Sequence, residues 1–161
     1  MTMKGTVLDL MVIGIVLFIT ALIFMFFSQF LQNVETQIQA QASVTGLNTT
    51  YIDKVQESFD VFDGAFVLLL FGFGAASILG AFKIDSHPAF FIFSFLTWII
   101  LIFLSTIFSN MMFELSQAPQ LAAGVAQFDL TIAVLLNLPT EMAIIGGIII
   151  IVLLGKAGNY L

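Results

Sequence analysis

Residues 10–27 read LMVIGIVLFITALIFMFF and contain no charged side chain. Three further apolar runs of at least this length follow at Ala65–Phe82, Ala89–Phe113 and Leu130–Gly155. Each run meets or approaches the roughly 20 apolar residues that cross about 30 Å of hydrocarbon at about 1.5 Å per residue in an α-helix. The sequence therefore predicts an all-α fold, a polytopic membrane helix bundle with four transmembrane helices.

The composition agrees with this prediction, because 60% of the 161 residues are hydrophobic and only 9% are charged, against about 25% in an ordinary soluble domain. So few residues lie outside the four runs that we expect a single integral membrane domain over residues 1–161. The chain has no Cys and one histidine, His87, which excludes disulfides, thiolate chemistry and bis-histidine haem ligation. No catalytic, metal or cofactor motif stands out, so we expect a protein that is not an enzyme and needs no cofactor.

The charged residues are unevenly placed. Ten Asp or Glu accompany four Lys and no Arg, and this acidic balance argues against binding of nucleic acid through a basic surface. Lys4, Lys83 and Lys156 fall on one side of the predicted membrane, and Lys54 falls on the other side among acidic residues. The positive-inside tendency therefore favours both termini on the inner side.

Beyond Phe27, apolar residues recur among polar ones at helical spacing, and the same spacing returns after a short turn near Gly46. Two amphipathic segments joined by a turn predict a helical hairpin over residues 28–60 that projects about 20 Å above the bilayer. The residues predicted to form its apolar seam or to contact partner proteins are Phe30, Val34, Ile38, Tyr51, Val55 and Phe59. The alternative is an outer loop with only residual helicity.

The second apolar run carries small residues at four-residue intervals, namely Gly72, Ala76 and Gly80. Small residues on one helical stripe let another backbone approach closely, which is how helices associate when lipid surrounds them. We expect this stripe to pack against another span of the same chain. Packing against a second subunit is the alternative that the pattern leaves open.

The fourth apolar run is interrupted by residues 137–141, which read NLPTE. If one helix spans the whole run, Asn137 and Glu141 form an intramembrane polar site, and ionisable residues at such depth often mark ion pathways. If a new helix begins at Pro139 instead, Glu141 lies in its first turn, near the outer surface and at the positive end of the helix dipole. Residues 115–138 then form an interfacial or partly buried segment. We favour this second interpretation, and a kinked helix without transport is a third.

Three features together resemble small multipass membrane proteins of tailless, lipid-containing viruses of microbes. They are the short inner ends, the Gln-rich outer hairpin, and the segment AAGVAQF of residues 122–128 that precedes LNLP at residues 136–139. The resemblance concerns general style over most of the chain. It implies a non-enzymatic structural protein in the internal membrane of a virion, whose exposed hairpin residues contact capsid or vertex proteins.

The leading hypothesis is a structural or assembly protein that lies in the lipid bilayer and contacts other structural or capsid proteins through exposed helical segments. The main alternative is a pore-forming or holin-like protein, a closed homo-oligomer that lines a path with Glu141, Asn137 or the hydroxyl groups of the third run. A small subunit of a cellular membrane complex is a second alternative. A scaffold predicts that these polar groups are hydrogen-bonded locally, whereas a pore predicts that they face water.

Overall fold

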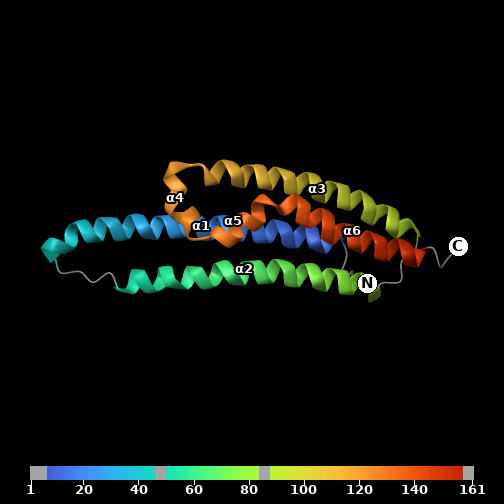
Figure 1. Cartoon of the computed structure of the whole chain (residues 1–161), viewed down its shortest axis with the longest axis horizontal. Coiled ribbons are helices and arrows are strands. Elements are labelled where there is room, and N and C mark those ends of the chain that lie inside the picture. Colours follow the sequence, from blue (N-terminus) through green and yellow to red (C-terminus); the bar gives the residue numbers. More distant parts are fainter. Residues whose placement is uncertain (1–6, 46–49, 84–87, 158–161) are drawn as a thin grey trace.

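The computed structural model describes the backbone of residues 7–45, 50–83 and 88–157 and the side chains of residues 7–41, 54–83 and 89–156. None of the described residues lies in a β-strand, so the all-α fold class is confirmed. Lys4, the turn near Gly46 and His87 lie outside the described residues. The elements are α1 (Val7–Thr45), α2 (Thr50–Lys83), α3 (Pro88–Ser116), the 3₁₀ turn η1 (Pro119–Leu121), α4 (Ala122–Ala126), α5 (Asp129–Leu136) and α6 (Leu138–Ala157) (Figure 1).

Four of the described helices contain segments long and apolar enough to cross a membrane. Many side chains that they expose are hydrocarbon, and Leu68, Phe103 and Ile151 are each at least 69% exposed. A surface of this kind is unfavourable in water and is the normal surface of a helix in hydrocarbon. The chain is therefore an integral membrane protein built as a helical bundle. The four segments are Val7–Gln41, Lys54–Lys83, Ala89–Ser116 and Leu138–Lys156.

The two longest helices, α1 and α2, run side by side and extend together beyond one end of the bundle (Figure 1). Both continue without a break from their apolar halves into the polar stretch that the sequence predicts to be a hairpin. At about 1.5 Å per residue, the 39 residues of α1 span about 58 Å, well beyond a hydrocarbon layer of about 30 Å. The two helical arms of the predicted hairpin are thus part of the fold, and the side of the membrane on which they project stays a prediction. The start of α1 and the end of α6 lie toward the opposite end of the bundle (Figure 1).

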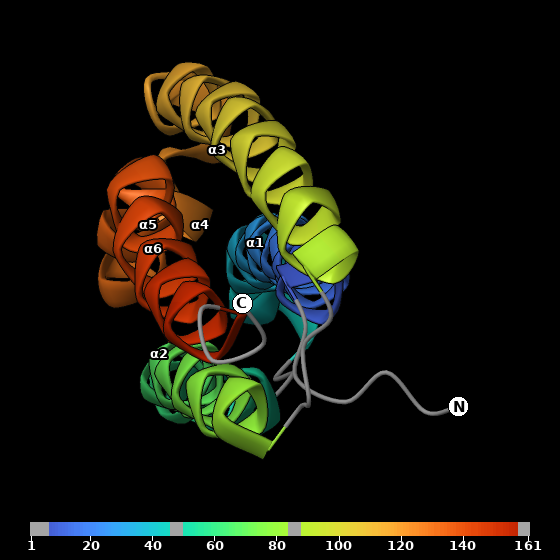
Figure 2. The same ribbon diagram turned by 90° about the vertical axis from the view of Figure 1, so that its right-hand side faces the viewer.

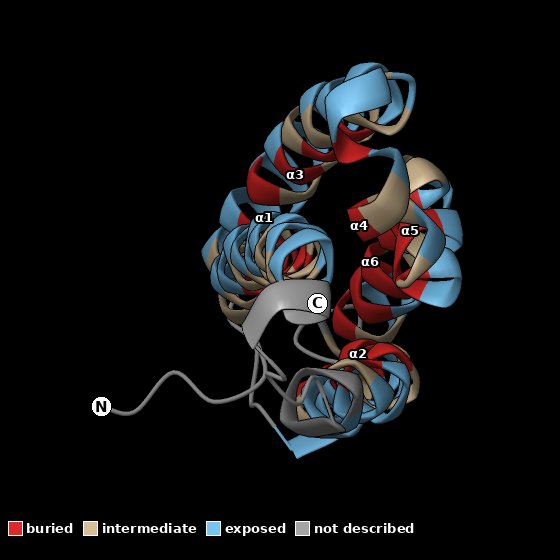
Figure 3. Cartoon of the chain, turned by 90° about the vertical axis from the view of Figure 1, so that its left-hand side faces the viewer, coloured by how far each residue is buried: buried red, intermediate tan, exposed pale blue. Residues whose placement is uncertain are grey.

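The buried side chains lie on the helix faces that are turned toward one another (Figure 3). The α3 and α6 helices pack closely because Trp98 of α3 lies against two glycines of α6 (Figure 2 shows the two helices side by side). A Cβ on Gly146 would come 2.4 Å from Trp98 Cδ1, and a Cβ on Gly147 would lie 3.6 Å from Trp98 Cζ2. The two glycines therefore provide the flat surface that the indole ring needs.

The prediction that Gly72, Ala76 and Gly80 pack inside the chain is wrong for Gly72 and Ala76 and stays a prediction for Gly80. Gly72 and Ala76 are exposed, Gly80 is half-buried, and a Cβ on Gly72 would meet nothing within 4 Å. Another face of α2 packs against α6, and the stripe does not lie on it. On the packed face, a Cβ on Gly74 would come 2.9 Å from the side chain of Ile145. Packing of the exposed stripe against a second subunit stays a prediction. The bundle-facing residues of α2 are Phe66, Leu70, Gly74, Ser77 and Ala81.

We expect Gly146→Ala to lower the free energy of unfolding by about 1–3 kcal/mol, because the new methyl group meets the indole ring of Trp98 in a packed interface. Gly72→Ala is the control, since it adds the same group to a transmembrane helix in open space and should raise stability by up to about 1 kcal/mol. Thermal unfolding in detergent micelles, followed by circular dichroism, measures both. Equal transition temperatures would contradict the packing of Trp98 on α6.

Candidate functional site

Between α3 and α6 the chain makes a compact excursion, residues 119–131, which we call the docked segment. It contains the helical part Pro119–Ala126 and the start of the helix Asp129–Leu136. The axes of these two helical parts differ by 109°. The bend sets α4 against α1 and α5 against α2 and α3 (Figure 1). The predicted interfacial or partly buried segment of residues 115–138 therefore consists of the end of α3, the docked segment and the rest of α5. Its depth in the membrane stays a prediction.

The side chain of Gln127 connects the docked segment to both α1 and α2. Its Oε1 atom accepts hydrogen bonds from Ser28 Oγ at 2.8 Å and from Gln32 Nε2 at 3.4 Å, both on α1. Its Nε2 atom donates to the backbone carbonyl of Gln56 on α2 at 2.8 Å. Ser28 is fully buried, and a buried hydroxyl or amide is tolerated when it is paired in this way. Gln127 therefore links the docked segment to α1 and to α2 through one side chain.

Gly124 brings the backbone of α4 directly against α1. A Cβ at this position would lie 2.6 Å from the carbonyl oxygen of Met25 and 3.4 Å from Cβ of Gln29. The close approach lets the Gly124 N–H donate to Gln29 Oε1 at 3.0 Å, and Gln32 Nε2 donates to the carbonyl of Ala123 at 3.3 Å. Because a side chain larger than hydrogen would separate the two helices, Gly124 is required for these hydrogen bonds.

Asp63 of α2 provides the N-terminal cap that α5 lacks in its own sequence. Phe128, the residue before α5, makes no side-chain cap hydrogen bond. Asp63 is only 7% exposed, and its two carboxylate oxygens accept the N–H groups of Leu130 at 3.0 Å and Thr131 at 2.7 Å. The first N–H groups of a helix have no acceptor within it and form the positive end of its dipole. The anionic side chain of Asp63 accepts hydrogen bonds from both N–H groups, and its negative charge stabilises the positive end of the α5 dipole.

The C-terminal end of α5 is held from α3. Ser109 Oγ donates to the carbonyl of Leu136 at 2.6 Å, and the side-chain amide of Asn137 donates to the carbonyl of Ala133 at 2.8 Å. These two contacts satisfy carbonyl groups that the end of α5 would leave without donors. The short helix α5 is thus fixed at one end by α2 and at the other by α3.

A new helix starts directly after this junction. The backbone carbonyl of Asn137 accepts the N–H groups of Thr140 at 3.0 Å and Glu141 at 3.2 Å, and α6 begins at Leu138. Glu141 therefore lies in the first turn of α6, as the second interpretation of the sequence predicts, and Pro139 occupies an early position where its missing N–H is harmless. A single unbroken fourth helix is excluded.

The two residues predicted to form an intramembrane polar site differ in their surroundings. Asn137 is exposed, and its amide is used by the backbone of α5. Glu141 is half-buried, and its Oε2 atom is buried with no hydrogen-bond partner among the described residues. The structure places both at the α5–α6 junction, and their depth in the membrane stays a prediction.

A second polar contact joins α1 and α2 nearer the tip of the hairpin. Gln56 Nε2 donates to Glu35 Oε2 at 2.8 Å, and Gln39 Nε2 donates to Glu35 Oε1 at 2.6 Å. Because the carbonyl of Gln56 also accepts the hydrogen bond from Gln127, this contact is continuous with the docked segment. The base of the hairpin is therefore held by polar side chains as well as by apolar packing.

The predicted apolar seam of the hairpin is only partly correct. Phe59 is buried, and its ring contacts the rings of Phe24, Phe27 and Phe128 at centroid distances of 5.7–6.4 Å. Val34 and Ile38 are half-buried. Phe30 and Val55 do not lie in the seam, because they are 59% and 42% exposed, and their contact with partner proteins stays a prediction. The side chain of Tyr51 lies outside the described residues. Phe30 is exposed because α1 turns the face of Ser28 and Gln32 toward its neighbours.

The sequence pattern does not single out Asp63, Gln127 or Gly124 as a group. In the sequence, Asp63 is a carboxylate next to an apolar run, and Gln127 and Gly124 lie in one stretch of small residues. Each is common in loops near membranes, and only the fold shows that they meet. Among the described residues, no group of three or more His, Cys, Asp or Glu is placed to hold a metal ion. The arrangement is suited to holding helices together.

We expect Asp63→Asn to lower the free energy of unfolding by about 1–3 kcal/mol, because the amide keeps one acceptor for two N–H groups and loses the charge that faces the helix dipole. The control is Asp60→Asn, an exposed carboxylate on the same helix, whose effect should stay within about 0.5 kcal/mol. Chemical or thermal unfolding in micelles measures both. If the two variants lose equal stability, Asp63 is not the cap of α5.

Gly124→Ala and Gly64→Ala should have effects of opposite sign. At Gly124 the methyl group meets the carbonyl oxygen of Met25, so the docked segment must move and stability falls by about 1–3 kcal/mol. At Gly64 nothing lies within 4 Å, and alanine in a helix interior raises stability by roughly 0.5–1 kcal/mol. The rate of limited proteolysis within residues 119–131, compared with thermal unfolding, reports whether the docked segment has moved. A harmless Gly124→Ala would contradict the close approach of α4 to α1.

Comparison of the chain with protein-family models, with curated proteins and with solved structures finds no match. Function must therefore be inferred from the residues and contacts described above.

Proposed function

We propose that this chain is a non-enzymatic structural or assembly protein of a membrane, as in the internal membrane of a virion, and that it contacts partner proteins through its projecting hairpin. The observation that carries the proposal is that most buried polar side chains of the described bundle are hydrogen-bonded inside the chain, with Trp98 Nε1, Thr131 Oγ1 and Glu141 Oε2 as the exceptions among the described residues. Asp63, Gln127 and Ser109 all bond to backbone or side-chain groups of neighbouring helices. Local pairing of this kind is what a scaffold requires and what a water-filled path would not provide.

The hydroxyl groups of α3 support the same proposal. Thr97 Oγ1 donates to the carbonyl of Phe93 at 2.9 Å, and Ser105 Oγ donates to the carbonyl of Ile102 at 2.8 Å. Both side chains are buried. Because these hydroxyls return to the backbone of their own helix, they need neither water nor a ligand.

The surface available to a protein partner is the part of the hairpin beyond the docked segment. On α1, Asn33, Thr36, Gln37 and Gln41 are exposed, and on α2 the residues on both sides of Gln56 are exposed and mostly polar or charged. From Ser28 to Thr45, α1 extends about 26 Å at about 1.5 Å per residue. A rigid polar rod held at its base by Gln127 and Asp63 is suited to reach a protein layer that lies next to the membrane.

The first test is native mass spectrometry of the chain gently extracted from its native membrane. We expect it to carry other structural proteins, and Gln37→Arg at the exposed hairpin surface should strongly reduce their recovery without changing thermal unfolding. The control is Gln117→Arg, which introduces the same charge at an exposed glutamine between α3 and η1. Association with capsid proteins would support the virion proposal, and association with cellular membrane enzymes would replace it by a subunit role. Equal recovery with both variants would exclude the hairpin as the contact surface.

A pore-forming or holin-like function is the second candidate, and one observation favours it: Glu141 Oε2 is buried without a hydrogen-bond partner among the described residues. A pore predicts a closed homo-oligomer in which this carboxylate faces water, and Glu141→Gln would then reduce ion flux across vesicles while leaving assembly intact. On the scaffold proposal, wild-type vesicles carry no flux above that of lipid alone, and Glu141→Gln changes only stability. A flux that depends on Glu141 would overturn the scaffold proposal.

A further inference from the structure

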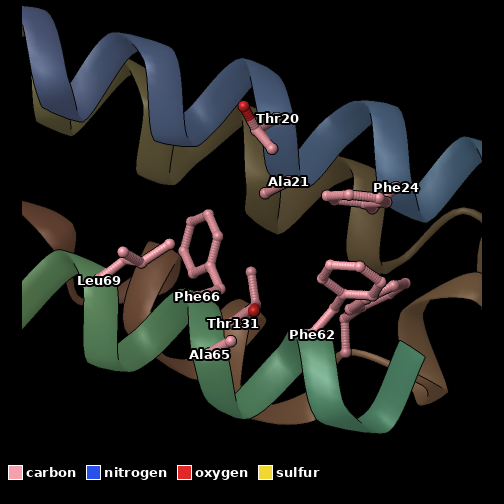
Figure 4. Close-up of a pocket in the computed structure, with 9 residues that line it drawn as sticks. Thr20, Ala21, Phe24, Phe62, Ala65, Phe66, Leu69 and Thr131 are labelled. Atoms are coloured by element: carbon pink, nitrogen blue, oxygen red, sulfur yellow. The ribbon is translucent and has the colours of Figure 1, made fainter. Parts of the chain in front are cut away.

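A cavity of about 150 Å³ lies between α1, α2 and α5. Figure 4 shows Thr20 and Phe24 of α1 facing Ala65, Phe66 and Leu69 of α2 across it, with Thr131 of α5 reaching in between them. In a close-packed protein, empty space larger than a few water molecules is uncommon and invites an occupant.

The wall of the cavity is apolar. Thr20 Oγ1 donates to the carbonyl of Val16 at 2.8 Å, and in Figure 4 this oxygen points away from the cavity. In the same view the oxygen of Thr131 lies on the side of Ala65, and the methyl group of Thr131 reaches into the space between α1 and α2. Cavities lined by hydrocarbon stay dry and accept apolar molecules. Water is therefore not the occupant.

The cavity communicates with the surroundings of the bundle through α2. Phe62 and Leu69 line it and are 47% and 50% exposed. Toward the hairpin, the ring of Phe24 stacks on that of Phe62 with centroids 5.0 Å apart and closes the cavity on that side. Leu69 lies within the apolar part of α2, where the surroundings are the hydrocarbon of the bilayer. The exposed rim is thus continuous with the lipid-facing surface.

We propose that a hydrocarbon chain of a membrane lipid occupies this cavity and fills the gap between α1 and α2. The bilayer supplies such chains at high concentration at the rim, and the narrow volume fits a chain of methylene groups but excludes a second helix. The proposal goes beyond the scaffold function and does not depend on it, since it requires only that the bundle resides in a membrane.

The test uses the full chain in vesicles of phosphatidylcholine that contain a small fraction of a lipid with a photoreactive diazirine in its acyl chain. After illumination, mass spectrometry of peptides locates the adducts. We expect adducts at Phe66 and Leu69 in clear excess over Leu68 and Leu79, which are exposed on α2 outside the cavity. Labelling of the cavity no higher than that of Leu68 and Leu79 would overturn the proposal without any variant.

Two variants, Ala65→Phe and Thr131→Val, and the control Ala75→Phe test which kind of molecule occupies the cavity. Ala65→Phe fills the cavity and should reduce cavity labelling roughly tenfold, whereas Ala75→Phe, an exposed position on the same helix, should leave it unchanged. Thr131→Val replaces the buried hydroxyl, which has no hydrogen-bond partner among the described residues, by a methyl group of similar size and should leave labelling unchanged or increase it. Loss of labelling in Thr131→Val would show that the occupant is held by a polar group, and would overturn assignment of a hydrocarbon chain.

Discussion

Pairing of backbone groups at the ends of the short helix α5 is the constraint on which the rest of the bundle depends. A helix break in a largely apolar molecule leaves N–H and C=O groups that little water can reach, and each one left unpaired is unfavourable by several kcal/mol in hydrocarbon. Asp63 from α2 accepts two N–H groups at the start of α5, and Ser109 from α3 donates to a carbonyl at its end. The break is therefore stable only where both neighbouring helices stand beside it.

The same principle recurs elsewhere in the molecule. Lys156 near the end of α6 donates to the carbonyl of Phe82 near the end of α2, so one helix again completes the terminus of another. Gln127 joins the docked segment to α1 and α2 through a single amide. Some polar side chains bond to the backbone of their own helix, as Thr97 and Ser105 do, and others bond to a neighbouring helix, as Asp63, Ser109 and Gln127 do. The second group helps to hold the six described helices and the 3₁₀ turn in a defined arrangement.

The sequence predicts the number of spans and their positions well, because length and hydropathy are local properties. It also predicts the new helix start at residues 138–141, because Pro139 and Glu141 are local signals for a first turn. It does not predict which face of a helix packs. Gly72 and Gly74 are two residues apart on α2, and only contact with Ile145 shows that Gly74 faces the bundle. Single-sequence periodicity cannot distinguish two stripes of small residues on the same helix.

The site around the docked segment could not be predicted for a different reason. Asp63 and Thr131 are 68 residues apart in sequence, and Gly124 and Gln29 are 95 apart. No local pattern links such pairs, because their partners are backbone N–H groups that every residue possesses. The predicted seam of the hairpin is wrong at Phe30 because α1 contacts the docked segment as well as α2. The buried face of α1 therefore contains Ser28 and Gln32.

The long sequence separation of the Asp63 contacts also has a consequence for biogenesis. α1 and α2 are synthesised before the docked segment, so Asp63 at first has neither of its N–H donors. α1 and α2 therefore lack this contact until Leu130 and Thr131 have been synthesised. A chain that ends before Leu130 would leave the carboxylate of Asp63 without these two partners. Synthesis of Leu130 and Thr131, rather than insertion of the first spans, is therefore the step that completes the pairing of Asp63.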